Sequence, residues 1–163
     1  MLGVSRMSAV PTDDLRFPKD LPPTDRWKKF FLGVRWLGPD LSFFKLLKAQ
    51  QAARSNDQMH TWGGGARQEI AVLISGILSR SLGWKTTVFL PQDVFAVACH
   101  GPTFDCIDRC YALKDAVESL EEKYAVSIPA RFWVGKEEAT FGEVVDAIIR
   151  LKDASPFHRG EPL

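Results

Sequence analysis

Three cysteines and one histidine within twelve residues are the first side chains in this sequence that could carry chemistry: Cys99, His100, Cys106 and Cys110. Thiolates and imidazoles are zinc ligands, and a helix would bring Cys106 and Cys110 to one side because they are four residues apart. The paired Cys-x-x-Cys spacing of structural zinc sites is absent, however. The pattern therefore favours reduced, buried thiols, and we expect neither a disulfide nor a metal site.

A nucleophile–histidine–acid set could also be written down from Cys99 or Cys106 with His100 and Asp105. Catalytic partners of this kind usually come from distant segments of the chain, so we expect no catalytic residue here. The three glycines at positions 63–65 lack the Lys-Ser/Thr ending of a phosphate-binding loop, and no predicted strand precedes them. They indicate a linker.

The elements that position these residues are predicted from helical periodicity. Apolar residues recur at helical spacing over residues 67–82, 103–124 and 140–151. Thr103 and Thr140 can cap the second and third helices, and Gly83 stands where the first helix should end. The side chains expected to face one common core are Ile74, Leu78, Ile107, Val117, Leu120, Val145 and Ile148.

The remaining segments differ in composition from this 67–151 domain. Residues 1–24 form a proline-punctuated, irregular lead over a surface, and residues 152–163 form a polar tail. Residues 25–66 contain two short aromatic helices followed by the glycine-rich linker. Docking of these aromatic helices on the domain is favoured, while contact with a membrane surface and a surface for self-association or for a partner are the alternatives.

Composition and charge exclude several classes of protein. An apolar fraction of 45% with 25% charged residues is typical of a soluble globular protein, and the sequence contains no run of the 18 or more apolar residues that a membrane span needs. The first residues do not resemble a signal peptide, so we expect a cytoplasmic protein. Residues 1–66 carry ten Lys/Arg against six Asp/Glu, and residues 67–151 carry nine against twelve. Neither imbalance is large enough to predict nucleic-acid binding.

Three blocks of the domain have a recognisable order. Residues 120–129 contain a leucine, two glutamates, an aromatic residue and then Ile-Pro; residues 140–148 open with Thr-Phe and continue as an apolar helix face; residues 70–83 form a helix ending in Leu-Gly. Residues 120–129 resemble the end of the second helix of acyl carrier proteins, residues 140–148 resemble the last helix, and residues 70–83 resemble the first helix. The resemblance covers about half of the chain. It implies an all-α, carrier-protein-like helical bundle with a long first loop, preceded here by the two short N-terminal helices.

The resemblance fails at the residue that carries the chemistry of that family. Acyl carrier proteins attach phosphopantetheine to the serine of an Asp-Ser-Leu motif at the start of the second helix, where free N–H groups favour a phosphate. Counting back from Tyr124 by the family's usual spacing places the attachment residue at Cys110, whereas matching the local sequence places it at Thr103. Neither position is a serine, and neither follows an acid. Thr103 and Cys110 are thus the candidate positions for phosphopantetheine, although a helix cap and a small core residue are the plainer interpretations.

The resemblance also implies how such a domain works. Carrier proteins meet basic partner surfaces through an acidic helix face, which makes Glu118, Glu121 and Glu122 the candidate partner-facing residues. The leading hypothesis is a degenerate, non-catalytic carrier domain that acts through protein–protein contact and holds no cofactor. The alternatives are a functional carrier modified at a residue other than serine and a small metal- or thiol-dependent enzyme that uses the three cysteines.

Overall fold

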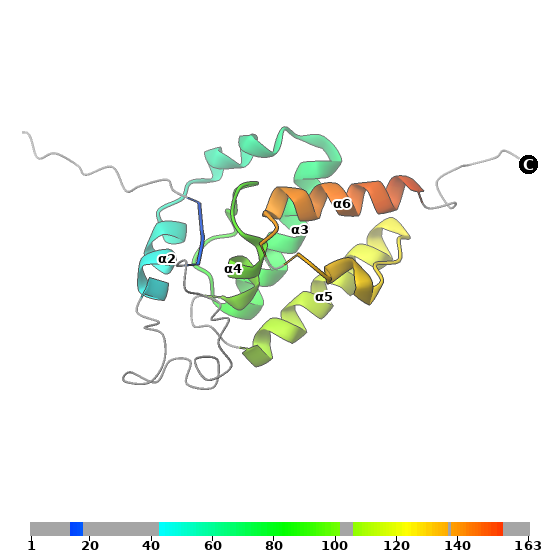
Figure 1. Cartoon of the computed structure of the whole chain (residues 1–163). Helices are drawn as coiled ribbons and strands as arrows, with labels where there is room; N and C mark the ends of the chain where they lie inside the picture. The colour runs from blue at the N-terminus through cyan, green and yellow to red at the C-terminus, as the bar shows by residue number, and fades with distance from the viewer. Residues whose placement is uncertain (1–13, 18–42, 102–105, 137, 155–163) are drawn as a thin grey trace, which may run out of the picture.

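The computed structural model describes residues 14–17, 43–101, 106–136 and 138–154, and it describes the side chains of α5 from Tyr111 onward (Figure 1). The elements are α2 (Phe43–Ala52), the 3-10 helix η1 (Asn56–Trp62), α3 (Gly65–Leu82), α4 (Phe95–His100), α5 (Cys106–Tyr124), the 3-10 helix η2 (Ala130–Trp133) and α6 (Phe141–Ala154). This confirms the predicted all-α fold. None of the helices in the described ranges is long and apolar enough to cross a membrane.

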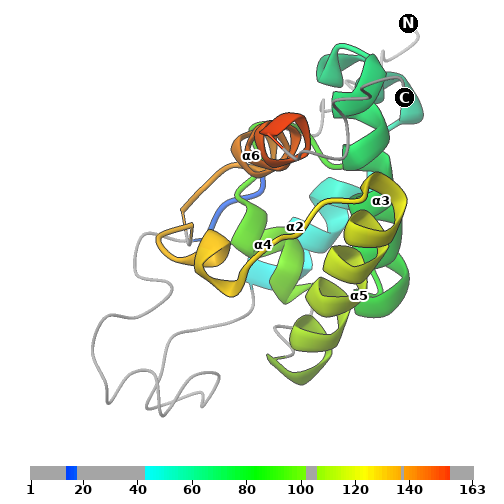
Figure 2. The ribbon, with the colours of Figure 1, turned by 90° about the vertical axis from the view of Figure 1, so that its right-hand side faces the viewer.

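The three predicted helices of the domain form the centre of the bundle. Helix α3 packs against both α5 and α6, and Figure 2, which looks along α6, shows α3 and α5 side by side. Gly83 ends α3 in the left-handed conformation (φ 74°), and its N–H donates to the Ser79 carbonyl, as expected for a glycine cap. The predicted core residues Ile74, Leu78, Leu120, Val145 and Ile148 are buried and Val117 is partly buried, whereas the side chain of Ile107 is outside the described part.

Three short helices among the described residues were not predicted, and one of them, η2, lies in the link between α5 and α6. Helix α4 lies within the segment that we expected to be one long loop, and η1 lies within the expected linker region. Each is too short to show a helical period. The glycines at 63–65 do not form an open linker: Gly63 caps η1 at φ 77° and Gly64 precedes α3 at φ 80°, so they make a tight turn between the two helices.

The N-terminal region is described only in part. Residues 14–17 are irregular, as predicted, but Leu15 is fully buried, so this segment is part of the core and does not merely cover a surface. The second aromatic helix corresponds to α2, where Phe44 and Leu47 are buried. The first one, predicted after Asp25, lies outside the described residues.

The start of α6 carries a capping box that gives a testable pH dependence. The Thr140 Oγ1 accepts the Glu143 N–H at 3.2 Å, and Glu143 Oε2 accepts the Thr140 N–H at 2.7 Å and its hydroxyl at 3.0 Å. These bonds, the backbone one first, hold the pKa of Glu143 below its ordinary value of 4.5. A lowered folded-state pKa stabilises the protein above the unfolded-state pKa, and this stabilisation is lost as the pH falls through the folded-state value.

We expect Thr140→Ala to lower the free energy of unfolding by about 0.5–2 kcal/mol at pH 7. The loss should shrink as the pH falls through the folded-state pKa of Glu143, which lies below 4.5, because the carboxyl is then protonated in both proteins. Urea unfolding of both proteins from pH 7 down to pH 3 measures this difference. Glu69→Gln, at an exposed position on α3, is the matched control. A Thr140→Ala loss that is independent of pH would show that the carboxylate does not contribute.

Candidate functional site at the start of α5

The two candidate attachment residues lie around the start of α5. Thr103 falls outside the described residues, and Cys110 lies in the second turn of α5, where the side chains of residues 106–110 are not described. What the structure describes is the chain on both sides: α4 and Gly101 before the site, and α5 from Tyr111 after it.

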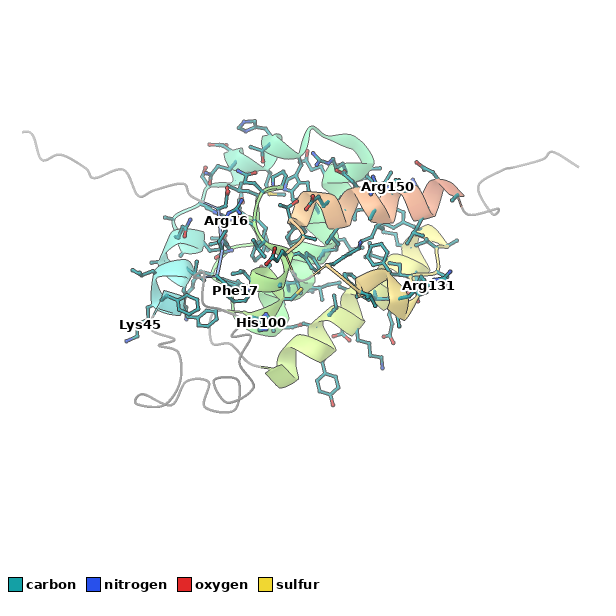
Figure 3. The ribbon with its side chains drawn as sticks, viewed as in Figure 1. Arg16, Phe17, Lys45, His100, Arg131 and Arg150 are labelled. Carbon is teal, nitrogen blue, oxygen red and sulfur yellow. The ribbon has the colours of Figure 1, made fainter. Side chains whose placement is uncertain are left out.

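The residues before the site are built into the core. Cys99 is buried, so its thiol is not offered to solvent. His100 ends α4 as a buried side chain, and its Nδ1 lies 2.6 Å from the Ala96 carbonyl. Since a carbonyl can only accept, Nδ1 carries the proton in this contact. The ring of Phe17 meets the imidazole edge-on, with the ring centroids 5.2 Å apart; both residues are labelled in Figure 3.

Gly101 sets the direction in which the chain leaves α4. Its φ is +71°, and a Cβ at this position would lie 2.9 Å from the Leu82 Cβ. Both the backbone conformation and the close approach require glycine. The end of α4 is thereby held against the end of α3, immediately before the segment that leads into α5.

The residues after the site form one exposed face of α5. Tyr111 is 66% exposed, and Asp115, Glu118 and Glu122 are exposed as well. Their spacings of four, three and four residues place them on one side of the helix. We call these four residues the acidic face. Lys114 lies beside it, 3.5 Å from the Glu118 carboxylate.

The third glutamate of the sequence hypothesis has a different position. Glu121 is half-buried, and its Oε1 accepts the N–H of Ile128 at 2.6 Å. This bond holds the chain after α5, where Ala125 adopts a left-handed φ of 49°. Of the three glutamates, two project into solvent and one secures the turn that follows the helix.

A buried ion pair is the polar cluster that the sequence analysis missed. Arg54 follows α2 and Asp93 precedes α4; the Nη1–Oδ2 distance is 2.6 Å and the Nη2–Oδ1 distance is 2.8 Å. Their side chains are 2% and 0% exposed. The two parallel bonds match a guanidinium to a carboxylate. One signal could have indicated it: Asp93 stands in a mostly apolar stretch, Phe89-Leu90-Pro91-Gln92-Asp93-Val94-Phe95.

The carboxylate of Asp93 is fully engaged by other groups of the chain. Besides the two Arg54 nitrogens, the Leu15 N–H donates to Oδ1 at 2.9 Å and the Leu90 N–H donates to Oδ2 at 2.7 Å. Four donors to a buried carboxylate leave little capacity for a ligand. We interpret this cluster as a structural centre that joins α2, the loop before α4 and residues 14–17.

The metal-site alternative depends on Cys99, Cys106 and Cys110. Within the described ranges, no group of three His, Cys, Asp or Glu side chains could hold a metal ion. The side chains of Cys106 and Cys110 lie outside the described part of the structure.

The described part of the candidate site thus consists of the glycine-directed turn after α4 and the exposed acidic face of α5. Comparison of the chain with models of known protein families, with curated proteins and with solved structures gives no match.

Proposed function

We propose that the chain contains a carrier-like helical domain that lacks an attachment serine and acts by docking its acidic face on a basic surface of a partner protein. The observation that carries the proposal is the combination of this exposed face with a helix start that lacks serine. Residues 101–111 read Gly-Pro-Thr-Phe-Asp-Cys-Ile-Asp-Arg-Cys-Tyr.

The order and lengths of the helices support the carrier-like part of the proposal. Helix α3 is followed by a long connection, then by α5, by a short link containing Ile128-Pro129 and by α6. This is the order from which the resemblance to acyl carrier proteins was inferred. Glu121 supports the link, because its carboxylate accepts the Ile128 N–H and so ties the chain after α5 back to the end of the helix.

The charges on α5 support the contact part of the proposal. Asp115, Glu118 and Glu122 are exposed with Tyr111 on one side of the helix, and Lys114 forms an ion pair with Glu118. Complementary charges at an interface mainly steer encounter and determine partner choice. An exposed tyrosine at one end of the face can supply apolar contact with a polar tip.

We predict that the protein keeps its unmodified intact mass when it is incubated with coenzyme A, magnesium and a promiscuous phosphopantetheinyl transferase. A threonine adds a methyl group beside the nucleophile, and such a group can slow a reaction in a tight site by about 10- to 200-fold. The missing acid before it weakens recognition further. Mass spectrometry of the intact chain and of its peptides measures the outcome. A gain of one phosphopantetheine on Thr103 or Cys110 would instead show a functional carrier.

Two double variants test whether the start of α5 is presented as it is in a carrier protein. Pro102→Asp/Thr103→Ser and Arg109→Asp/Cys110→Ser each restore an Asp-Ser pair at one of the two candidate positions. We expect one of them to accept phosphopantetheine under the same conditions. If neither does while both remain folded, the start of α5 is not presented as in a carrier protein, and the carrier-like part of the proposal is wrong.

A capture experiment tests whether the acidic face binds a partner protein. The wild-type chain is used to capture proteins from the cells that produce it, beside Glu118→Gln/Glu122→Gln and the control Glu69→Gln/Glu138→Gln, whose positions are also exposed. We expect a partner that is retained by the wild-type and control chains, lost with the α5 variant and weakened by salt. Equal retention by all three chains would contradict docking through the acidic face.

A further inference from the structure

Helix α2 has a solvent-facing side that carries positive charge and no negative charge. Its sequence contains two lysines and no acidic residue. Lys45, Leu46 and Ala49 are exposed, and Lys48 is half-buried. Residues three and four positions apart share one side of a helix, so the two lysines and Ala49 lie together, with Leu46 beside them. We call these four residues the basic face, and Figure 3 shows Lys45 pointing away from the bundle.

The lysines of the basic face differ from most other cations whose side chains the structure describes. Those others either pair with a carboxylate of their own chain or lie over an aromatic ring: Arg16, Arg54, Arg67 and Lys114 in the first group, Lys123, Lys136 and Lys152 in the second. Lys45 and Lys48 form no ion pair with any residue in the described ranges. Of the helices whose side chains are described, α2 alone therefore offers a pair of uncommitted cations.

The acidic face of α5 is the counterpart of the basic face in charge. Its carboxylates at Asp115 and Glu122 form no ion pair with another described residue. Each face also holds one large apolar side chain in solvent: Leu46 is 73% exposed on the basic face, and Tyr111 is 66% exposed on the acidic face. Opposite charges around an apolar contact are typical of a specific protein interface, so the two faces complement each other.

The two faces lie on different sides of one molecule. Helix α5 packs against α3 and α4, and Figure 1 shows α2 at the left of the bundle and α5 at its lower right. Both faces are exposed to solvent in the single chain. A contact between them therefore joins two copies of the chain.

We propose that the basic surface to which the acidic face docks is the basic face of a second copy of this chain. The inference rests on the proposed function and names the partner that the acidic face meets. Because the contact joins two different surfaces, it is heterologous, and each copy offers one face of each kind. Exposed charges in contact contribute a modest free energy and are screened by salt. We therefore expect a reversible association that weakens as the ionic strength rises.

Charge reversal tests whether the two faces meet. Sedimentation equilibrium of the full-length chain at low ionic strength, where the Debye length exceeds about 10 Å, measures the dissociation constant of self-association. Lys45→Glu/Lys48→Glu and Glu118→Lys/Glu122→Lys should each raise this dissociation constant at least about tenfold, because like charges then face each other. An equimolar mixture of the two variants should recover the association, because one variant keeps the acidic face and the other keeps the basic face. The chain with all four changes should recover it as well, since both signs are exchanged.

The matched control is Lys85→Glu/Arg150→Glu, which changes the net charge by the same amount as the α2 variant at exposed positions outside both faces. It should leave the dissociation constant nearly unchanged. Recovery in the mixture requires both reversed chains to be folded. Should one of them fail to fold, Lys45→Gln/Lys48→Gln or Glu118→Gln/Glu122→Gln takes its place and should still raise the dissociation constant.

Three results would overturn the inference: a wild-type chain that stays monomeric at millimolar concentration, an association that neither reversal weakens, and a mixture of the reversed chains that does not recover it. The first of these can be separated from a failure of the proposed function. If the monomeric wild-type chain captures a protein of another sequence and loses it with Glu118→Gln/Glu122→Gln, the acidic face is a docking surface but its partner is not a second copy.

Discussion

Replacing Asp93 with asparagine is expected to lower the free energy of unfolding by about 3–5 kcal/mol, because the change leaves the Arg54 guanidinium buried without a compensating charge. The pair is sensitive to substitution because both side chains are almost fully buried and two short hydrogen bonds join them. The amide NH2 also replaces one of the two carboxylate oxygens, so the N–H of either Leu15 or Leu90 loses its acceptor and faces another donor. Equilibrium unfolding in urea, followed by tryptophan fluorescence, measures the loss.

Two further variants separate the ion pair from a general effect of the substitution. Asp153→Asn, exposed in the last turn of α6, should change the stability by less than about 0.5 kcal/mol. Arg54→Met/Asp93→Leu removes both charges, so it should lose less than the sum of the two single changes. It should not return to the wild-type value, because the two backbone N–H groups still lack their acceptor. A loss below about 1 kcal/mol for Asp93→Asn would mean that water reaches the pair.

The helices that could be predicted from the sequence are those with a repeating pattern of apolar residues and a recognisable cap. In α3, α5 and α6 the apolar residues repeat along one face for several turns, and caps such as Gly83 and Thr140 mark the ends. The core residues Ile74 and Leu120 follow from the same period. Helix α4 could not be found in this way, since its six residues, Phe95–His100, are all candidates for burial and show no polar face.

The features that depend on distant residues escaped the sequence analysis. Arg54 and Asp93 are 39 positions apart, and Leu15 and Asp93 are 78 positions apart. No periodicity connects such positions; only the packed fold brings them together. A charged residue in an apolar stretch, as at Asp93, indicates that a partner is needed but does not identify it.

In the candidate site, too, the sequence predicted what depends on one helix and missed what depends on the chain that follows it. Exposure of Glu118 and Glu122 was implied by their helix positions, and the structure places both at the surface. Glu121 shares the same run of acids, yet its bond to Ile128 arises because the chain turns back after α5. A helical pattern describes one helix, whereas that bond depends on the turn that follows it. For this reason Glu121→Gln is unsuitable as a probe of partner binding, and the acidic face is defined without it.

The aromatic cluster at the start of α6 leads to the second large expected effect. Phe141 is fully buried and its ring meets three others: Trp62 at 5.5 Å, Phe89 at 5.6 Å and Phe95 at 5.1 Å. These rings belong to η1, the loop before α4, α4 and α6. Segments far apart in the sequence therefore share one aromatic contact, and Trp62 also donates its indole N–H to the Phe89 carbonyl at 2.9 Å.

We expect Phe141→Ala to lower the free energy of unfolding by about 3–5 kcal/mol, through lost burial and the cavity that remains among the other three rings. Phe141→Leu should lose less, because it keeps much of the volume and gives up mainly the ring–ring contacts. Val134→Ala, at a side chain that is 78% exposed, is the matched control and should stay within about 0.5 kcal/mol of the wild type. Urea unfolding gives all three values. If Phe141→Ala were no more destabilising than Val134→Ala, the four rings could not form the common core that joins η1 and α4 to α6.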